Sequence, residues 1–118
     1  MRMSLGLLEV GIRNYQGEKE SAEALLSKYV SSCHDRLFLT VADYLAGKVT
    51  EEGLREQAGN SPENTLIVFA NAGFWAEGAR DRSKAVRLYR EALGSLLDNW
   101  VEFDFVRERL NRLRRQPD

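Results

Sequence analysis

The amino-acid sequence predicts an all-α protein that forms one domain over residues 1–118. Its apolar content of 43% and charged content of 30% are typical of a folded globular chain. Only two prolines are present, and residues that favour helices are abundant. Apolar side chains recur at helical spacing, and residues that cap or end helices separate these runs. Together these features predict about seven helices.

The first two helices are expected before residue 32. Ser4 caps the first helix and Gly17 ends it, and the second covers residues 18–31. The expected apolar face of the first helix is Leu5, Leu8, Ile12 and Tyr15. The expected apolar face of the second is Ala22, Leu25, Leu26, Tyr29 and Val30.

A capping-box pattern, Ser32-Cys33-His34-Asp35, predicts the start of a third helix with Ser32 as its cap. This helix stops at Gly47, and its apolar side chains are Phe38, Val41, Ala42 and Leu45. Thr50 then caps a short fourth helix, which ends at Gly59 and carries Leu54 and Ala58.

Three further helices complete the chain. Ser61-Pro62 places a cap residue before a proline at the first helical position, so the fifth helix starts there and reaches about Glu77. Asp81 caps the sixth helix and Asn99 caps the seventh. The side chains expected inward are Leu66, Phe69, Ala70 and Gly73 on the fifth; Ala85, Leu88, Tyr89, Ala92, Leu93 and Leu96 on the sixth; Phe103, Val106, Leu110 and Leu113 on the seventh.

A short motif recurs along the chain: a large apolar residue, two residues, an apolar or small residue, then a small residue. It begins at Leu7, Phe38 and Phe69, and weakly at Phe103, so its copies lie about 31 to 34 residues apart. That spacing fits a unit of two helices with short loops. The small residue predicts a close approach between the first helix of each unit and its partner.

Residues 66–99 resemble a tetratricopeptide repeat. The resemblance rests on Phe69, Ala72-Gly73, Ala85, Tyr89 and Ala92-Leu93. The segment departs from the family pattern at Ala76, where Tyr is usual, at Ala72, where Leu is usual, and in lacking a late Pro. Residues 4–59 match only loosely, as two degenerate units. The resemblance implies a right-handed stack of antiparallel helical hairpins, with residues 100–114 as a C-terminal capping helix.

Members of this family usually bind protein segments in a concave groove lined by the first helix of each pair. The resemblance therefore implies a non-enzymatic adaptor whose partner is a peptide or protein. The groove leans acidic and would suit a basic or mixed peptide. The partner-binding residues that this implies are Arg36, Thr40, Asp43, Asn71, Phe74, Glu77, Asp104 and Glu108.

No pattern in the sequence predicts an enzyme, a cofactor or a metal. Cys33 and His34 are adjacent and therefore diverge by about 100° on a helix, which does not make a nucleophile–base pair. Glu51 and Glu52 fit the first turn of a helix, where acids stabilise the helix dipole. The glycines do not have the spacing of a phosphate-binding loop.

A net charge of −1 argues against bulk electrostatic binding to nucleic acid or to a membrane surface. The single cysteine permits no internal disulfide, and no signal peptide or membrane span is evident, so a cytoplasmic location is expected. Two alternatives to the adaptor stay open. One is a structural module that associates with itself. The other, less favoured, is an accessory RNA-binding protein that uses Arg107, Arg109, Arg112, Arg114 and Arg115.

Overall fold

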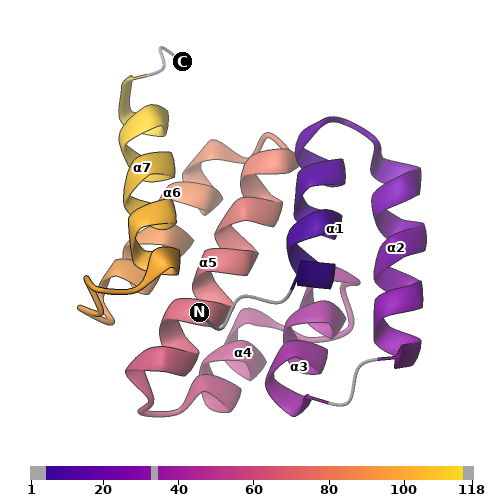
Figure 1. Cartoon of the computed structure of the whole chain (residues 1–118), viewed down its shortest axis with the longest axis horizontal. Coiled ribbons are helices and arrows are strands. Elements are labelled where there is room, and N and C mark those ends of the chain that lie inside the picture. The colour runs from indigo at the N-terminus through magenta and orange to yellow at the C-terminus, as the bar shows by residue number, and fades with distance from the viewer. Residues whose placement is uncertain (1–4, 33–34, 116–118) are drawn as a thin grey trace.

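A computed structural model describes residues 5–32 and 35–115 of the chain, which form seven α-helices and no strand. Figure 1 shows their arrangement. The helices are α1 (Leu5–Tyr15), α2 (Lys19–Ser32), α3 (Arg36–Leu45), α4 (Glu51–Ala58), α5 (Pro62–Gly78), α6 (Arg82–Leu93) and α7 (Val101–Arg115). The prediction of an all-α chain is confirmed. None of these helices combines the length and the apolarity that crossing a membrane requires.

The helix α5 lies at the centre of the molecule and packs against α1, α3, α4, α6 and α7. Every residue from Leu66 to Gly78 is buried except Trp75, which is half-buried. A helix that is apolar on all sides is expected to be enclosed by other elements. The core is therefore built around a single helix.

The order of the helices around α5 departs from a strictly sequential stack. In such a stack the α3–α4 pair would separate the α1–α2 pair from α5. Here α1 packs directly against α5, while α3 and α4 cover the other half of the same helix (Figure 1). The helices α1 and α2 pack side by side, as do α5 and α6.

Two glycines of the recurring motif allow close helix contacts. A Cβ atom on Gly73 would lie 2.5 Å from Cδ1 of Tyr89, so α6 approaches α5 closely at this point. A Cβ on Gly11 would lie 2.7 Å from Cδ2 of Phe74. The expected approach within a helix pair is confirmed at Gly73. Gly11 instead faces α5, because α1 packs there.

Three predicted helix starts are confirmed and the one at Ser32 is wrong, while the predicted cap Ser4 lies outside the described residues. The side chains of Thr50, Ser61 and Asp81 each accept a hydrogen bond from the backbone N–H three residues on, at 3.1–3.2 Å. The predicted cap Ser32 is instead the last residue of α2. Asp35 caps α3, because its carboxylate accepts the N–H groups of the second and third residues that follow it.

The buried face of α1 agrees with the predicted one only in part, since Leu8 and Tyr15 pack against the core but Ile12 does not. Val10, Gly11 and Asn14 are buried, whereas Ile12 is 41% exposed. The reason is the position of α5, since the Asn14 amide donates a hydrogen bond of 2.9 Å to the backbone carbonyl of Trp75. A polar residue thus occupies the contact that helical spacing assigned to an apolar one.

The end of α6 also differs from the prediction. The helix stops at Leu93, and Leu96 is 79% exposed instead of buried. Leu96 has a φ of 59°, a left-handed backbone conformation that is unfavourable for a bulky residue. The predicted cap Asn99 is not adjacent to α7, because α7 begins at Val101.

Candidate functional site

Three of the eight predicted binding residues lie on α5 and are buried. Asn71, Phe74 and Glu77 are only 5–8% exposed. Asn71 donates to the carbonyl of Ile67 on its own helix, at 2.8 Å. The expectation that these three side chains face a ligand is corrected, since neighbouring helices cover this side of α5.

Glu77 belongs to a buried polar cluster that joins four helices. The Tyr89 hydroxyl donates to Glu77 Oε1 at 2.9 Å, and Arg109 Nε donates to the same oxygen at 3.0 Å. Arg109 also donates to Glu77 Oε2, and to the Tyr15 hydroxyl at 2.9 Å. Phe74 stacks on the Tyr15 ring, with centroids 5.7 Å apart. This cluster is a joint between α1, α5, α6 and α7, and the Glu77 carboxylate is already bonded to Tyr89 and Arg109 within it.

The surroundings of this cluster fix the protonation of two of its members. Burial, together with the adjacent Glu77 carboxylate, raises the pKa of Tyr89 well above its ordinary value. Hydrogen bonding to Glu77 raises the pKa of Arg109 further above its ordinary range. The phenol therefore stays protonated and the guanidinium stays charged in the folded chain.

Alkaline titration is expected to expose the buried phenol. The folded-state pKa of Tyr89 exceeds its unfolded value of 10.0. The protonated phenol therefore contributes fully to the free energy of unfolding below about pH 10, and this contribution is lost as the pH rises above that value. We expect one of the four tyrosines to form tyrosinate only as the helices unfold, measured by tyrosinate absorbance alongside circular dichroism. Tyr89→Phe is expected to remove this late step. A late step that persists in the variant would assign it to another tyrosine.

The other five predicted binding residues lie on two helices that are not packed together. Arg36, Thr40 and Asp43 are exposed or half-exposed on α3, and Asp104 and Glu108 are exposed on α7. The two acids on α7 pair with Arg107 and Arg112 on the same helix, at 2.8 and 2.9 Å. The described structure therefore does not bring the eight residues into one surface.

A groove exists elsewhere, between α2, the end of α3 and α5. It consists of two adjoining hollows of about 310 and 340 Å³, and both are lined by Leu45 and Trp75. The first hollow is completed by Glu23, Leu26, Ser27, Val30, Ala46 and Lys48. The second is completed by Tyr44, Gly47, Val49, Ala72, Ala76, Ala79, Asp81 and Lys84. We call this combined feature the Trp75 groove.

One side chain of the Trp75 groove has an unused hydrogen-bonding group. The Tyr44 hydroxyl is buried and makes no hydrogen bond to any described residue. Lys84 Nζ lies 5.6 Å from the centroid of the Tyr44 ring. Buried polar groups in proteins are almost always paired. The Tyr44 hydroxyl is an exception to this rule among the described residues.

Sequence reasoning did not find this groove. Trp75 follows Phe74 directly, and on a helix the two side chains diverge by about 100°. The local signal was thus an aromatic pair that must face two directions. Which of the two stays accessible depends on the spacing between α2 and α3, which no local pattern encodes.

The described residues bear on metal binding and on RNA binding. Within the resolved ranges no group of three or more His, Cys, Asp or Glu side chains is placed to hold a metal ion. Cys33 and His34 lie outside the described residues. Of the five arginines of α7, Arg107, Arg109 and Arg112 are paired with carboxylates. This leaves a smaller basic surface than the sequence suggested.

Comparison with protein-family models, with curated proteins and with solved structures found no match for this chain.

Proposed function

We propose that this chain is a non-enzymatic interaction module that binds a segment of a partner protein in the Trp75 groove. The observation that carries the proposal is the half-buried Trp75 side chain, which lines both hollows of the groove. Trp75 is the one residue between Leu66 and Gly78 that is not buried. A partly exposed Trp in a concave apolar site is the usual centre of a protein-binding hot spot.

The lining of the groove indicates the kind of segment it would accept. Its floor is mainly apolar, with Leu26, Val30, Leu45 and Trp75 contributing. Each hollow also carries one acid and one base: Glu23 with Lys48 in the first, and Asp81 with Lys84 in the second. Such balanced charges favour neither a strongly basic nor a strongly acidic ligand. The preferred segment is mostly apolar.

A protein-binding adaptor of this kind needs no sequential hairpin stack. The tetratricopeptide resemblance of residues 66–99 corresponds to the α5–α6 pair and its Gly73–Tyr89 contact. The proposed groove lies between α2, the end of α3 and α5, and its second hollow extends to the start of α6. The proposal therefore keeps the adaptor function and moves its site to Trp75, Leu45 and Tyr44.

A selection with random peptides tests the proposal. Phage-displayed peptides are selected on the wild-type chain, and binding is then measured by fluorescence in a Trp100→Phe background, where Trp75 is the remaining tryptophan. We expect mostly apolar peptides that shift the Trp75 emission and bind with roughly micromolar affinity. Ala46→Arg, which places a long cation in the first hollow, is expected to weaken binding at least about tenfold, equivalent to about 1.4 kcal/mol.

A matched variant controls for the added charge. Ala24 is an exposed alanine on α2 that does not line the groove. Ala24→Arg therefore adds the same side chain without blocking the site and is expected to leave the affinity unchanged. Selection that yields no peptides, or peptides that bind Ala46→Arg as well as wild type, would contradict the proposal.

A further inference from the structure

The loop between α6 and α7 carries an exposed apolar tip. Leu96 is 79% exposed and Val101 is 57% exposed, and the half-buried Trp100 lies beside Val101 in the chain. Leu96 also holds a left-handed backbone conformation, with φ at 59°. Its side chain gains almost no packing in return for this unfavourable conformation. The apolar side chains of the tip are removed from water only when another protein surface covers them.

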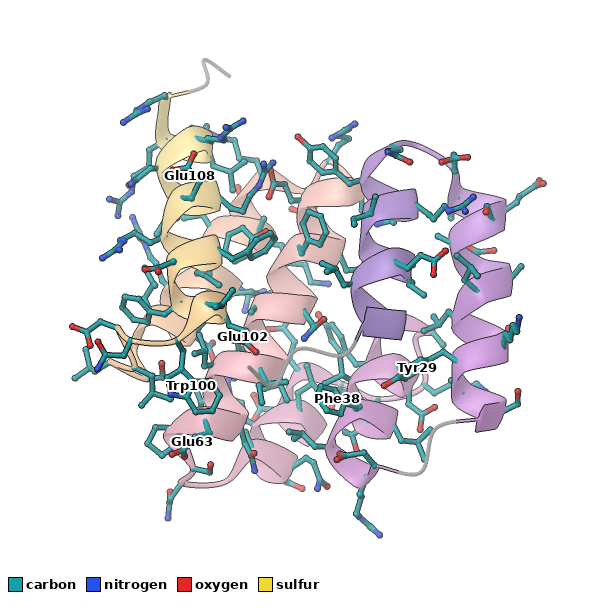
Figure 2. The ribbon with its side chains drawn as sticks, viewed as in Figure 1. Tyr29, Phe38, Glu63, Trp100, Glu102 and Glu108 are labelled. Carbon is teal, nitrogen blue, oxygen red and sulfur yellow. The ribbon has the colours of Figure 1, made fainter. Side chains whose placement is uncertain are left out.

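The tip lies at an acidic end of the molecule. This end is formed by the α4–α5 turn and the α6–α7 loop, which share a small hollow. Neither segment contains Lys or Arg: none occurs between Arg55 and Arg80, or between Glu91 and Arg107. The acids at this end are Glu56, Glu63 and Asp98. Figure 2 shows Glu63 and Trp100 together there, with Glu108 toward the opposite end.

The opposite end of the molecule is basic. The end of α5, the start of α6 and the end of α7 meet there and bring together Arg80, Arg82, Arg114 and Arg115. The acids there are Asp81 and Glu108, and Glu108 is paired with Arg112. A hollow of about 200 Å³ lies at this end, lined by Tyr15, Glu77, Arg80, Arg82 and Leu113. Its acid, Glu77, is already neutralised by Arg109. We call this feature the Arg80 hollow.

We propose that the Leu96 tip of one copy of this chain docks in the Arg80 hollow of a second copy. The two ends are complementary in charge, and an exposed apolar side chain meets a hollow whose lining includes Tyr15 and Leu113. The overall net charge of −1 opposes association only weakly. Because the two surfaces differ, the contact is head-to-tail, and it builds open chains that lengthen with concentration.

Sedimentation of the full chain tests the proposal. At low salt, near 20 mM, we expect the average mass to rise between about 20 µM and about 1 mM protein, since a small contact of this kind is weak. At about 500 mM salt the mass is expected to fall toward that of the monomer, because screening weakens the attraction between the two ends. A monomer at every concentration would overturn the proposal.

Two glycine variants each disable one side of the proposed contact: Leu96→Gly removes the tip, and Arg80→Gly alters the hollow. Leu96 and Arg80 both have positive φ, at 59° and 64°, so glycine suits both positions and keeps the fold. Each variant alone is expected to stay monomeric, with a circular dichroism spectrum like that of wild type. Leu96→Gly keeps a working hollow and Arg80→Gly keeps a working tip. An equimolar mixture is therefore expected to form a one-to-one dimer and nothing larger.

A third variant distinguishes this contact from non-specific association through exposed apolar side chains. Ile12 is 41% exposed on α1 and does not line the Arg80 hollow. Ile12→Ala is expected to associate as wild type does. The assignment of the tip would be contradicted if Leu96→Gly still associated as wild type does. It would also be contradicted if Ile12→Ala lost association to the same extent as Leu96→Gly. These measurements use no peptide ligand, so they stand or fall independently of the Trp75 groove.

Discussion

Glu77→Gln is expected to lower the free energy of unfolding by about 2–3 kcal/mol, because it leaves the Arg109 guanidinium inside the protein without its counter-charge. The wild-type carboxylate accepts hydrogen bonds from both Arg109 and Tyr89. The expected loss lies at or below the low end for a buried pair, since the Arg109 side chain keeps 15% exposure. Urea unfolding followed by circular dichroism measures it.

Two comparisons make this result specific. Glu108→Gln removes an exposed carboxylate that pairs with Arg112 on the same helix, and we expect no measurable change. The double variant Glu77→Leu with Arg109→Met replaces the pair with apolar side chains and is expected to recover most of the loss. If Glu77→Gln were no more destabilising than Glu108→Gln, the buried joint would not be holding the four helices together.

Gly73→Ala is expected to destabilise the chain by about 2 kcal/mol, even though alanine is favoured over glycine within a helix by roughly 1 kcal/mol. The added Cβ would lie 2.5 Å from Cδ1 of Tyr89. That ring is fully buried and its hydroxyl is bonded to Glu77, so it cannot move aside without breaking the joint. Thermal and urea unfolding both report the change.

The matched substitution is Gly53→Ala on α4. There the new Cβ approaches the Cγ1 atom of Val49, a half-exposed side chain that can rotate. We expect stability equal to or slightly above that of wild type. A gain in stability from Gly73→Ala would show that α5 and α6 are less closely packed than the structure describes. Combining Gly73→Ala with Tyr89→Leu is expected to cost less than the sum of the two single changes.

The helices were predictable because their ends are encoded locally. Ser61-Pro62 and Thr50 carry their capping function within three residues, and the structure confirms both. The enclosed surface of α5 was not predictable in the same way. The repeat resemblance implies that Asn71, Phe74 and Glu77 face a ligand, because they lie beside the packing motif on the first helix of the pair. Their actual surroundings come from distant parts of the chain.

The partners of the buried joint show why this limit exists. Glu77 is bonded to Arg109, 32 positions away, and Arg109 is bonded to Tyr15, 94 positions away. Helical periodicity describes each of these residues on its own helix and says nothing about which helices meet. The Trp75 groove depends in the same way on α2, α3 and α5 together. Leu96 is the opposite case, since its spacing continued the α6 pattern after the helix had ended.

The central position of α5 limits how this chain can change. A true repeat array can gain or lose a unit, because each unit contacts only its neighbours. Here α1, α3, α4, α6 and α7 all pack against α5, so removing any one of them opens the same core. The chain is therefore indivisible. Insertions are tolerated at its loops, but no helical pair can be deleted or duplicated as a module.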